Sequence, residues 1–256
     1  MILKNQDCLD FLTSLEDESI DLVVTDPPYF QIVKNNWDNQ WSSEDDYIEW
    51  CRKWTEECAR VLKPECCMYV WGTTKTATFL RYKLEVLNNL KDLFYKNWII
   101  WAYDWGGRTK KTFPRKHEDL LMYSKGKTHK FYPDRIRIPY KVKKNVRKGV
   151  ENNPLGKIPT DVWTKNNHTT SKEYCGWHPT QKPISLLERI ILANTNEGDS
   201  VLDCFSGSGS TMIACETTNR SFVGCEFDKE YYSKSLERVE NLKPHLTYKG
   251  ENQNVK

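Results

Sequence analysis

Residues 21–30 read DLVVTDPPYF, in which an apolar run typical of a buried strand ends in one acid, two prolines and one aromatic residue. Neither proline has a backbone N–H, so the loop offers hydrogen-bond acceptors without competing donors at two positions. Asp26 supplies a carboxylate, Pro27 a carbonyl that the rings hold in place, and Tyr29 a flat face. An acceptor pair beside a ring suits an exocyclic amino group on a planar base. The alternative is a plain turn, because Asp-Pro and Pro-Pro are common in loops.

Such an amino group needs help to react. The amine of adenine or cytosine is a poor nucleophile, because its lone pair is delocalised into the ring. Two acceptors on its two N–H bonds favour a more tetrahedral nitrogen, and they stabilise the positive charge that builds up as nitrogen attacks an electrophile. Proximity and in-line orientation supply much of the remaining rate. We therefore expect a catalytic loop made of Asp26, Pro27, Pro28 and Tyr29.

A second stretch, VLDCFSGSGSTMIAC at 201–215, predicts a cofactor site. A predicted strand ends at Asp203, a glycine turn follows, and a helix begins directly after it with free backbone N–H groups. The next predicted strand ends at Glu226, which is where Rossmann-like folds place the acid that binds ribose hydroxyls. Met212 stands where the dinucleotide fingerprint has Gly or Ala, which disfavours NAD and FAD. A tight strand–helix connection is the structural alternative.

The elements that must position these loops alternate between strand and helix. Apolar patterns predict strands at 20–25, 66–71, 97–103, 118–124, 200–204 and 221–226, and helices at 44–62, 75–89, 183–194, from about 210, and at 228–242. Strands that alternate with helices imply an α/β fold with a mostly parallel central sheet covered on both faces. In such sheets ligands bind at the carboxyl ends of the strands, so both loops are expected at one edge.

Composition restricts the class of protein. The 256 residues include 38% hydrophobic and 29% charged residues, as in a soluble globular protein. No apolar run approaches the roughly 18–20 residues of a membrane helix, and Lys4, Asp7 and Asp10 argue against a secretory signal. The nine cysteines form no CxxC pair, which indicates reduced thiols in a cytoplasmic protein and gives no spacing to support a metal site.

Residues 125–175 interrupt the alternation and predict an inserted segment. Lys125 to Lys148 contains ten Lys or Arg and one acid, with aromatic residues interleaved, and a stretch rich in Asn, Pro and Gly follows. A solvated charged face is the alternative, but this local excess favours nucleic acid as a partner. We expect DNA contacts from basic residues here and just before it: Lys110, Lys111, Arg115, Lys141, Lys143, Lys144, Arg147 and Lys148.

Together TDPPY, DCFSGSG and HPTQKP (178–183) resemble the amino-group DNA methyltransferases that use S-adenosylmethionine. The order of the motifs is that of the β class, and the closest likeness is to small adenine methyltransferases of restriction–modification systems. The resemblance implies a Rossmann-like methyltransferase fold with a catalytic domain at 1–124 and 176–243, a target-recognition insertion at 125–175 and a polar tail at 244–256. It also allows a homodimer and a partner restriction endonuclease that acts on the same site.

The resemblance assigns roles to single residues. Asp26 and Pro27 would hold the target amine, and Tyr29 would stack on a base flipped out of the duplex. The remaining positions would bind the cofactor: Asp7 and Cys8 its adenine ring, Glu226 its ribose, and Thr180, Lys182, Asp203, Phe205, Gly207 and Gly209 its methionine side. Alternatives exist for several: Asp7 as a helix cap, Lys182 as a surface charge, Glu226 as a loop acid, and His178 as a structural residue.

The leading hypothesis is a site-specific DNA adenine-N6 methyltransferase. Cytosine-N4 is the first alternative, because both amines need the same acceptors and Asp at the first loop position favours adenine only by family association. RNA and protein glutamine are weaker alternatives. A different class is a catalytically silent DNA-binding relative, which the intact DPPY loop disfavours, and a NAD-linked oxidoreductase is the third hypothesis. The recognition sequence cannot be deduced, since most Lys and Arg contacts are to phosphate.

Overall fold

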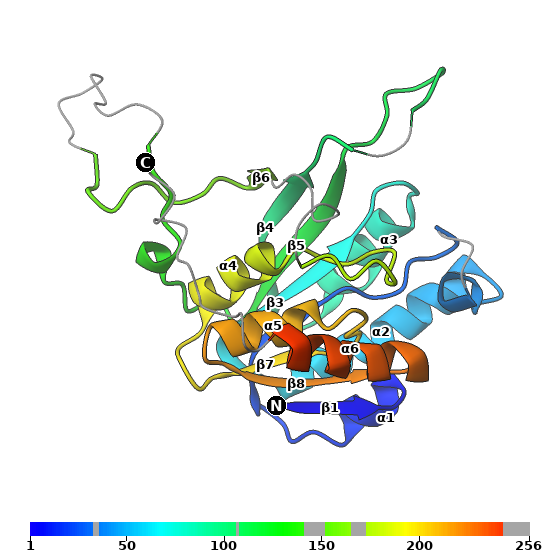
Figure 1. Cartoon of the computed structure of the whole chain (residues 1–256). Helices are drawn as coiled ribbons and strands as arrows, with labels where there is room; N and C mark the ends of the chain where they lie inside the picture. Colours follow the sequence, from blue (N-terminus) through cyan, green and yellow to red (C-terminus); the bar gives the residue numbers. More distant parts are fainter. Residues whose placement is uncertain (33–35, 106–107, 141–151, 165–172, 243–256) are drawn as a thin grey trace.

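In the part of the chain that the structure describes, eight strands form one sheet with helices on both faces (Figure 1). The computed structural model describes residues 1–32, 36–105, 108–140, 152–164 and 173–242. Its strand order is β1-β8-β7-β2-β3-β5-β4-β6. The strands are β1 (Ile2–Asn5), β2 (Ile20–Thr25), β3 (Leu62–Gly72), β4 (Leu93–Ala102), β5 (His117–Lys125), β6 (Val162–Thr164), β7 (Ser200–Asp203) and β8 (Ser221–Glu226).

Most neighbouring strands are parallel, as the sequence predicts. Among the described strands, only β5 runs against its neighbours, since it pairs antiparallel with both β3 and β4. The central strand β2 is buried along its whole length, because it lies between β7 and β3 and has helices on both faces. A strand in that position has no solvent-facing side, which explains the continuous apolar run that precedes Asp26.

Two apolar cores lie on opposite faces of the sheet. One packs β2 and β3 against α1 (Cys8–Thr13), α2 (Glu44–Val61) and α3 (Thr78–Glu85). The other packs the opposite side chains of the sheet against α4 (Ile184–Asn194), α5 (Ser210–Thr217) and α6 (Lys229–Leu242). Figure 1 shows the same division, with the C-terminal helices on the near face. The predicted α/β fold with helices on both faces is confirmed.

Local sequence explains the longest helix. Ser43 caps α2 by accepting a hydrogen bond from the Asp46 N–H, and three acids follow in the first turn, where the helix dipole favours negative charge. Trp54, Cys58 and Val61 recur at helical spacing and are fully buried. The helix ends at Val61, three residues before Pro64, in agreement with the predicted stop.

Several boundaries differ from the sequence prediction. The expected helix at 75–89 is shorter, α3, and is followed by a separate 3-10 turn at Leu87–Asn89. Strands β1 and β6 and helix α1 were not predicted. β6 lies within the expected insertion and yet joins the main sheet beside β4, so part of that segment packs with the catalytic core. In the described part of the chain, no helix is long and apolar enough to cross a membrane.

Trp54 tests how much the α2 packing contributes. Trp54→Ala should lower the free energy of unfolding by about 3–5 kcal/mol, because it removes a fully buried ring and leaves a cavity. Leu84→Ala on α3, where the side chain is 61% exposed, is the control and should change it by less than about 0.5 kcal/mol. Urea denaturation measures both variants. Equal losses would contradict the assigned packing.

Candidate active site

The carboxyl ends of the strands place the two predicted loops side by side. β2 and β7 are adjacent and parallel, so Asp26, directly after β2, lies next to Asp203 at the end of β7. β8 pairs with β7 on its other side and ends at Glu226. Three acids that are far apart in the sequence therefore meet at one edge of the sheet, as expected for a parallel α/β fold.

The DPPY loop is fixed by hydrogen bonds from three directions. The Tyr29 hydroxyl donates to Asp26 Oδ1 (2.6 Å), and the Tyr29 N–H donates to Asp38 Oδ1 (2.8 Å). Tyr47 of α2 donates its hydroxyl to the Pro28 carbonyl (3.0 Å). The Tyr29 ring is thus oriented by Asp26, and side chains of the protein hold the loop at Tyr29 and Pro28.

Lys182 lies inside the site and not on the surface. Its side chain is 6% exposed, and its ammonium forms ion pairs with Asp26 Oδ2 and with Glu118 Oε2 (3.1 Å). Glu118 lies at the start of β5. It also lies over the Trp71 ring, 5.3 Å from the centroid. Burial works to lower the pKa of Lys182, but Asp26 and Glu118 outweigh it and raise the pKa. The surface-charge alternative for Lys182 is therefore wrong.

Asp203 joins the two loops. Its Oδ1 accepts from the Thr25 hydroxyl (3.0 Å) and the Phe205 N–H (3.1 Å), and its Oδ2 accepts from the Thr211 hydroxyl (2.6 Å). Burial raises the pKa of Asp203 to about 6, although these three donors oppose the shift. The carboxylate thereby fixes the start of the glycine turn. Its hydrogen bond with Thr25, the residue before Asp26, connects this turn to the DPPY loop.

The glycine turn approaches neighbouring groups too closely for a side chain. Gly207 has φ +49°, and a Cβ there would lie 2.8 Å from His178 Nε2. Gly209 has φ +74° and is the N-cap residue of α5. Arg238 of α6 donates to the Ser208 carbonyl (2.7 Å) and so holds the turn from behind. The turn needs glycine for its backbone conformation and for its contact with His178.

Glu226 closes the far side of the turn. Its Oε2 accepts from the Gly207 N–H (2.7 Å) and its Oε1 from the Asp228 N–H (2.8 Å). Burial raises the pKa of Glu226 to about 7, against the effect of those two hydrogen bonds. Burial likewise lowers the pKa of His178 to about 4, so this ring is neutral at physiological pH.

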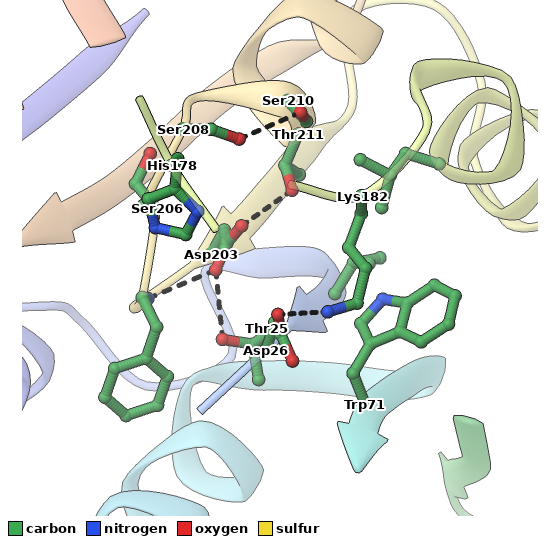
Figure 2. A pocket seen from close by; sticks show the side chains of 14 residues that line it. Thr25, Asp26, Trp71, His178, Lys182, Asp203, Ser206, Ser208, Ser210 and Thr211 are labelled. Atoms are coloured by element: carbon green, nitrogen blue, oxygen red, sulfur yellow. Dashed lines mark hydrogen bonds and ion pairs between the residues drawn. The ribbon is translucent and has the colours of Figure 1, made fainter. Parts of the chain in front are cut away.

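These loops line a small cavity that opens to solvent (Figure 2). Figure 2 shows Lys182 and Trp71 on one side, His178 and Ser206 on the other, and Asp26, Thr25 and Asp203 between them. Among the predicted site residues, the lining includes Asp26, Lys182, Asp203, Phe205 and Gly207. Among the described residues, no group of three or more His, Cys, Asp or Glu could hold a metal ion.

Other predicted residues lie beside the cavity or away from it. Asp7 caps α1 by accepting from the Leu9 N–H (2.8 Å), so the helix-cap alternative describes its contact, and Cys8 is buried behind it. Both follow β1, whose Asn5 pairs with Glu226. Thr180 lies near Lys182, which donates to its carbonyl (3.4 Å). The two prolines, Pro27 and Pro28, continue the loop from Asp26.

The predicted DNA-contacting residues divide into two groups. Lys110 and Lys111 are exposed on the connection between β4 and β5, whereas the Arg115 guanidinium donates to the hydroxyl of Thr73, directly after β3 (2.8 Å). The others lie outside the described residues: Lys141, Lys143, Lys144, Arg147 and Lys148.

Sequence reasoning missed Glu118 and Trp71. Both belong to predicted strands, but their place in the site depends on the antiparallel pairing of β3 with β5, which brings Trp71 opposite Leu120. The sequence signal that could have identified Glu118 was the acidic pair Glu118-Asp119 directly before an apolar run.

Trp41 packs on Tyr47 and Trp50 (4.8 and 4.7 Å between ring centroids), and Trp37 stacks on His178 (6.4 Å) beside the glycine turn.

Comparison with known structures supports the same fold. The PvuII DNA methyltransferase, described as cytosine-N4-specific, superposes with a TM-score of 0.73 at 19% identity, over 95% of this chain and 91% of that chain. The M1.HpyAVI–SAM complex superposes with a TM-score of 0.61 at 24% identity, over 92% of this chain and 98% of that chain. At these identities, the likeness is one of fold.

Sequence relatives are closer. The chain is 39% identical to the Type II methyltransferase M.HpaI of Haemophilus parainfluenzae over 90% of this chain and 71% of that protein. It is 34% identical to the DNA adenine methyltransferase YhdJ of Escherichia coli strain K12 over 91% of this chain and 81% of that protein. The family model N6_N4_Mtase, described as DNA methylase, matches residues 20–237. This match spans both loops and most of the chain, which therefore belongs to the N6_N4_Mtase family of DNA methylases.

Proposed function

We propose that this protein transfers a methyl group from S-adenosylmethionine to the N6 amino group of adenine, within a specific DNA sequence. The observation that carries the proposal is the position of Asp26, whose carboxylate lies in the same cavity as Asp203 and the glycine turn. An amine acceptor and a cofactor turn on adjacent strands are the two parts that amine methylation requires. DNA as the substrate and S-adenosylmethionine as the cofactor agree with the family.

The residues present fit that cofactor. The buried Ser206 hydroxyl has no hydrogen-bond partner among the described residues, and the turn beside it has no side chain at Gly207. Glu226 keeps free lone pairs on a carboxylate that is already oriented by two N–H donors, as a ribose diol needs. Asp203, Phe205, Gly209, Thr180 and Lys182 would border the methionine end, and Asp7 and Cys8 the adenine end. When bound, the cofactor supplies an electrophilic methyl group on a sulfonium.

Asp26 and the Pro27 carbonyl would accept the two N–H bonds of the target amine. As nitrogen becomes positive, the Asp26 carboxylate stabilises it in a buried setting, where such an interaction is stronger than in water. Lys182 and the Tyr29 hydroxyl already occupy one oxygen of Asp26 each, but a carboxylate accepts about four hydrogen bonds. Glu118 gives Lys182 a second anionic partner, so Lys182 stays neutralised when Asp26 binds the amine. The base must leave the duplex to reach this depth.

Adenine is proposed over cytosine because the relative named a DNA adenine methyltransferase is 34% identical, whereas the cytosine-N4 structure is related by fold at 19% identity. Cytosine-N4 is the second candidate, since the acceptors are the same. A homodimer, a partner restriction endonuclease and the domain boundaries at 125–175 stay predictions of the family resemblance, and a cytoplasmic location stays a prediction from the cysteines.

Asp26→Ala tests the catalytic role. Genomic DNA from a methylation-free bacterium that expresses the wild type should carry N6-methyladenine in one short motif, and DNA from the variant should carry none, because the amine loses its charged acceptor. Base-resolved sequencing measures both. Asp92→Ala, an exposed acid at the opposite edge of the sheet, is the control and should keep the modification. N4-methylcytosine would overturn the base assignment, and no modification by a folded wild type would favour a silent DNA-binding protein.

Gly207→Ala tests the cofactor turn. The added Cβ would lie 2.8 Å from His178 Nε2 at a φ of +49°, so affinity for S-adenosylhomocysteine should fall by roughly tenfold or more, equivalent to about 1.4 kcal/mol. Gly198→Ala is the matched control: its φ is also positive, +83°, but a Cβ there meets nothing within 4 Å. Isothermal titration calorimetry should show unchanged affinity for the control. Equal losses in both variants would indicate general backbone strain.

The pKa of Glu226 predicts a pH dependence of cofactor binding. The ionised carboxylate is the form that accepts two ribose hydroxyls, so affinity should rise with pH through about 7. About a tenth of such a group is ionised at pH 6 and about nine tenths at pH 8, a roughly ninefold change. Glu226→Gln should bind more weakly at pH 8 and lose most of this dependence. A wild-type affinity that is flat from pH 6 to 8 would argue against Glu226 as the ribose ligand.

A further inference from the structure

We propose that Phe113 is a wedge that enters the DNA duplex beside the target base and promotes its extrusion. The inference rests on the proposed function and deepens it. It concerns the finger, defined here as residues 108–116 of the connection between β4 and β5. Figure 1 shows this connection, in green, extending beyond the body of the sheet.

The tip of the finger exposes an aromatic ring among cations. Phe113 is 100% exposed, the most exposed of the large apolar side chains in the described residues. The nine residues RTKKTFPRK contain five Lys or Arg and no acid. Single exposed rings are common on protein surfaces, so a partner for Phe113 is inferred from the charged residues around it. Its basic neighbours identify a polyanion as that partner, and a ring between cations fits stacked bases flanked by phosphates.

The finger has a defined shape at both ends. At its tip, the Thr112 N–H donates to the Thr109 hydroxyl (3.2 Å), which closes a turn around Lys110 and Lys111. At its base, Lys116 donates to the Trp105 carbonyl (2.8 Å), and Arg115 donates to the hydroxyls of Thr73 (2.8 Å) and Thr74 (3.2 Å). These bonds attach the finger to the segment that follows β3.

The base of the finger adjoins the amine site. The end of β4, the start of β5 and the end of β3 lie at the same edge of the sheet. Glu118, the second residue of β5, forms an ion pair with Lys182, which also forms an ion pair with Asp26. Glu118 is five positions after Phe113, and an extended chain of that length spans at most about 17 Å. The ring is therefore within reach of the base steps that adjoin a nucleotide inserted in the cavity.

Extrusion of a base costs stacking and pairing energy, and proteins that deform DNA often insert an apolar side chain between base steps. Phe113 would occupy space at the opened step and contact the bases that remain stacked. Lys110 and Lys111 would meanwhile contact phosphates. The two roles differ in one measurable respect. Phe113 would lower the free energy needed to extrude the target base, whereas the two lysines would strengthen binding to DNA of any sequence.

The test uses the full chain and short duplexes that contain the motif found by genomic sequencing. One duplex is fully paired, and the other carries a mismatch opposite the target base, which makes extrusion easier. Phe113→Ala should lower kcat/KM on the paired duplex by roughly 10- to 100-fold, the range expected for loss of ring–base stacking, and much less on the mismatched duplex. Phe113→Trp should keep most of the activity on both.

Two controls separate the wedge from other effects. Tyr95→Ala removes an exposed aromatic residue at the far end of β4 and should change neither rate. The double variant Lys110→Ala, Lys111→Ala should weaken binding to both duplexes equally and reduce the salt dependence by roughly 0.9 per lysine. Equal losses for Phe113→Ala on the two duplexes, or no loss on the paired one, would overturn the inference. A wild type that methylates neither duplex would instead overturn the proposed function.

Discussion

The hydrogen bond from the Thr25 hydroxyl to the Asp203 carboxylate joins two loops that lie 178 residues apart in the chain. It connects the last residue of β2 to the last residue of β7. Asp26 follows on one side, and the glycine turn begins on the other. Because Asp203 also holds Thr211 and the Phe205 N–H, a displacement of either strand would move the amine site and the cofactor turn relative to one another. In the proposed function, this buried carboxylate would help to set the distance between the target amine and the cofactor.

The four carboxylates at this edge of the sheet are stabilised in two different ways. Asp26 and Glu118 share Lys182, while Asp203 and Glu226 are stabilised by hydroxyl and N–H donors. Burial raises the pKa of Asp203 to about 6 and of Glu226 to about 7, so their ionisation has a cost that a ligand can offset. A sulfonium, a ribose diol and an exocyclic amine are all cations or donors. In the proposed function, the same acidic edge would therefore bind both the cofactor and the target base.

The sequence allowed prediction of the parts of the site that depend on parallel strands. Asp26, Asp203 and Glu226 each end an apolar run, and the carboxyl ends of parallel strands meet at one edge by rule. Glu118 and Trp71 depend on an antiparallel pairing between β3 and β5 that no local pattern encodes. β1 and β6 escaped prediction because four and three residues are too few for a period to appear, and both gain stability from a neighbour distant in sequence.

The strand order also has a consequence for synthesis of the chain. β2 and β3 are close in sequence and can pair early, but the other neighbour of β2 is β7, at Ser200–Asp203. Until that strand has left the ribosome, one edge of the fully buried β2 has no partner, and an unpaired apolar edge favours aggregation. The yield of folded protein is therefore expected to depend on chaperone supply and on translation speed while β7 is still missing.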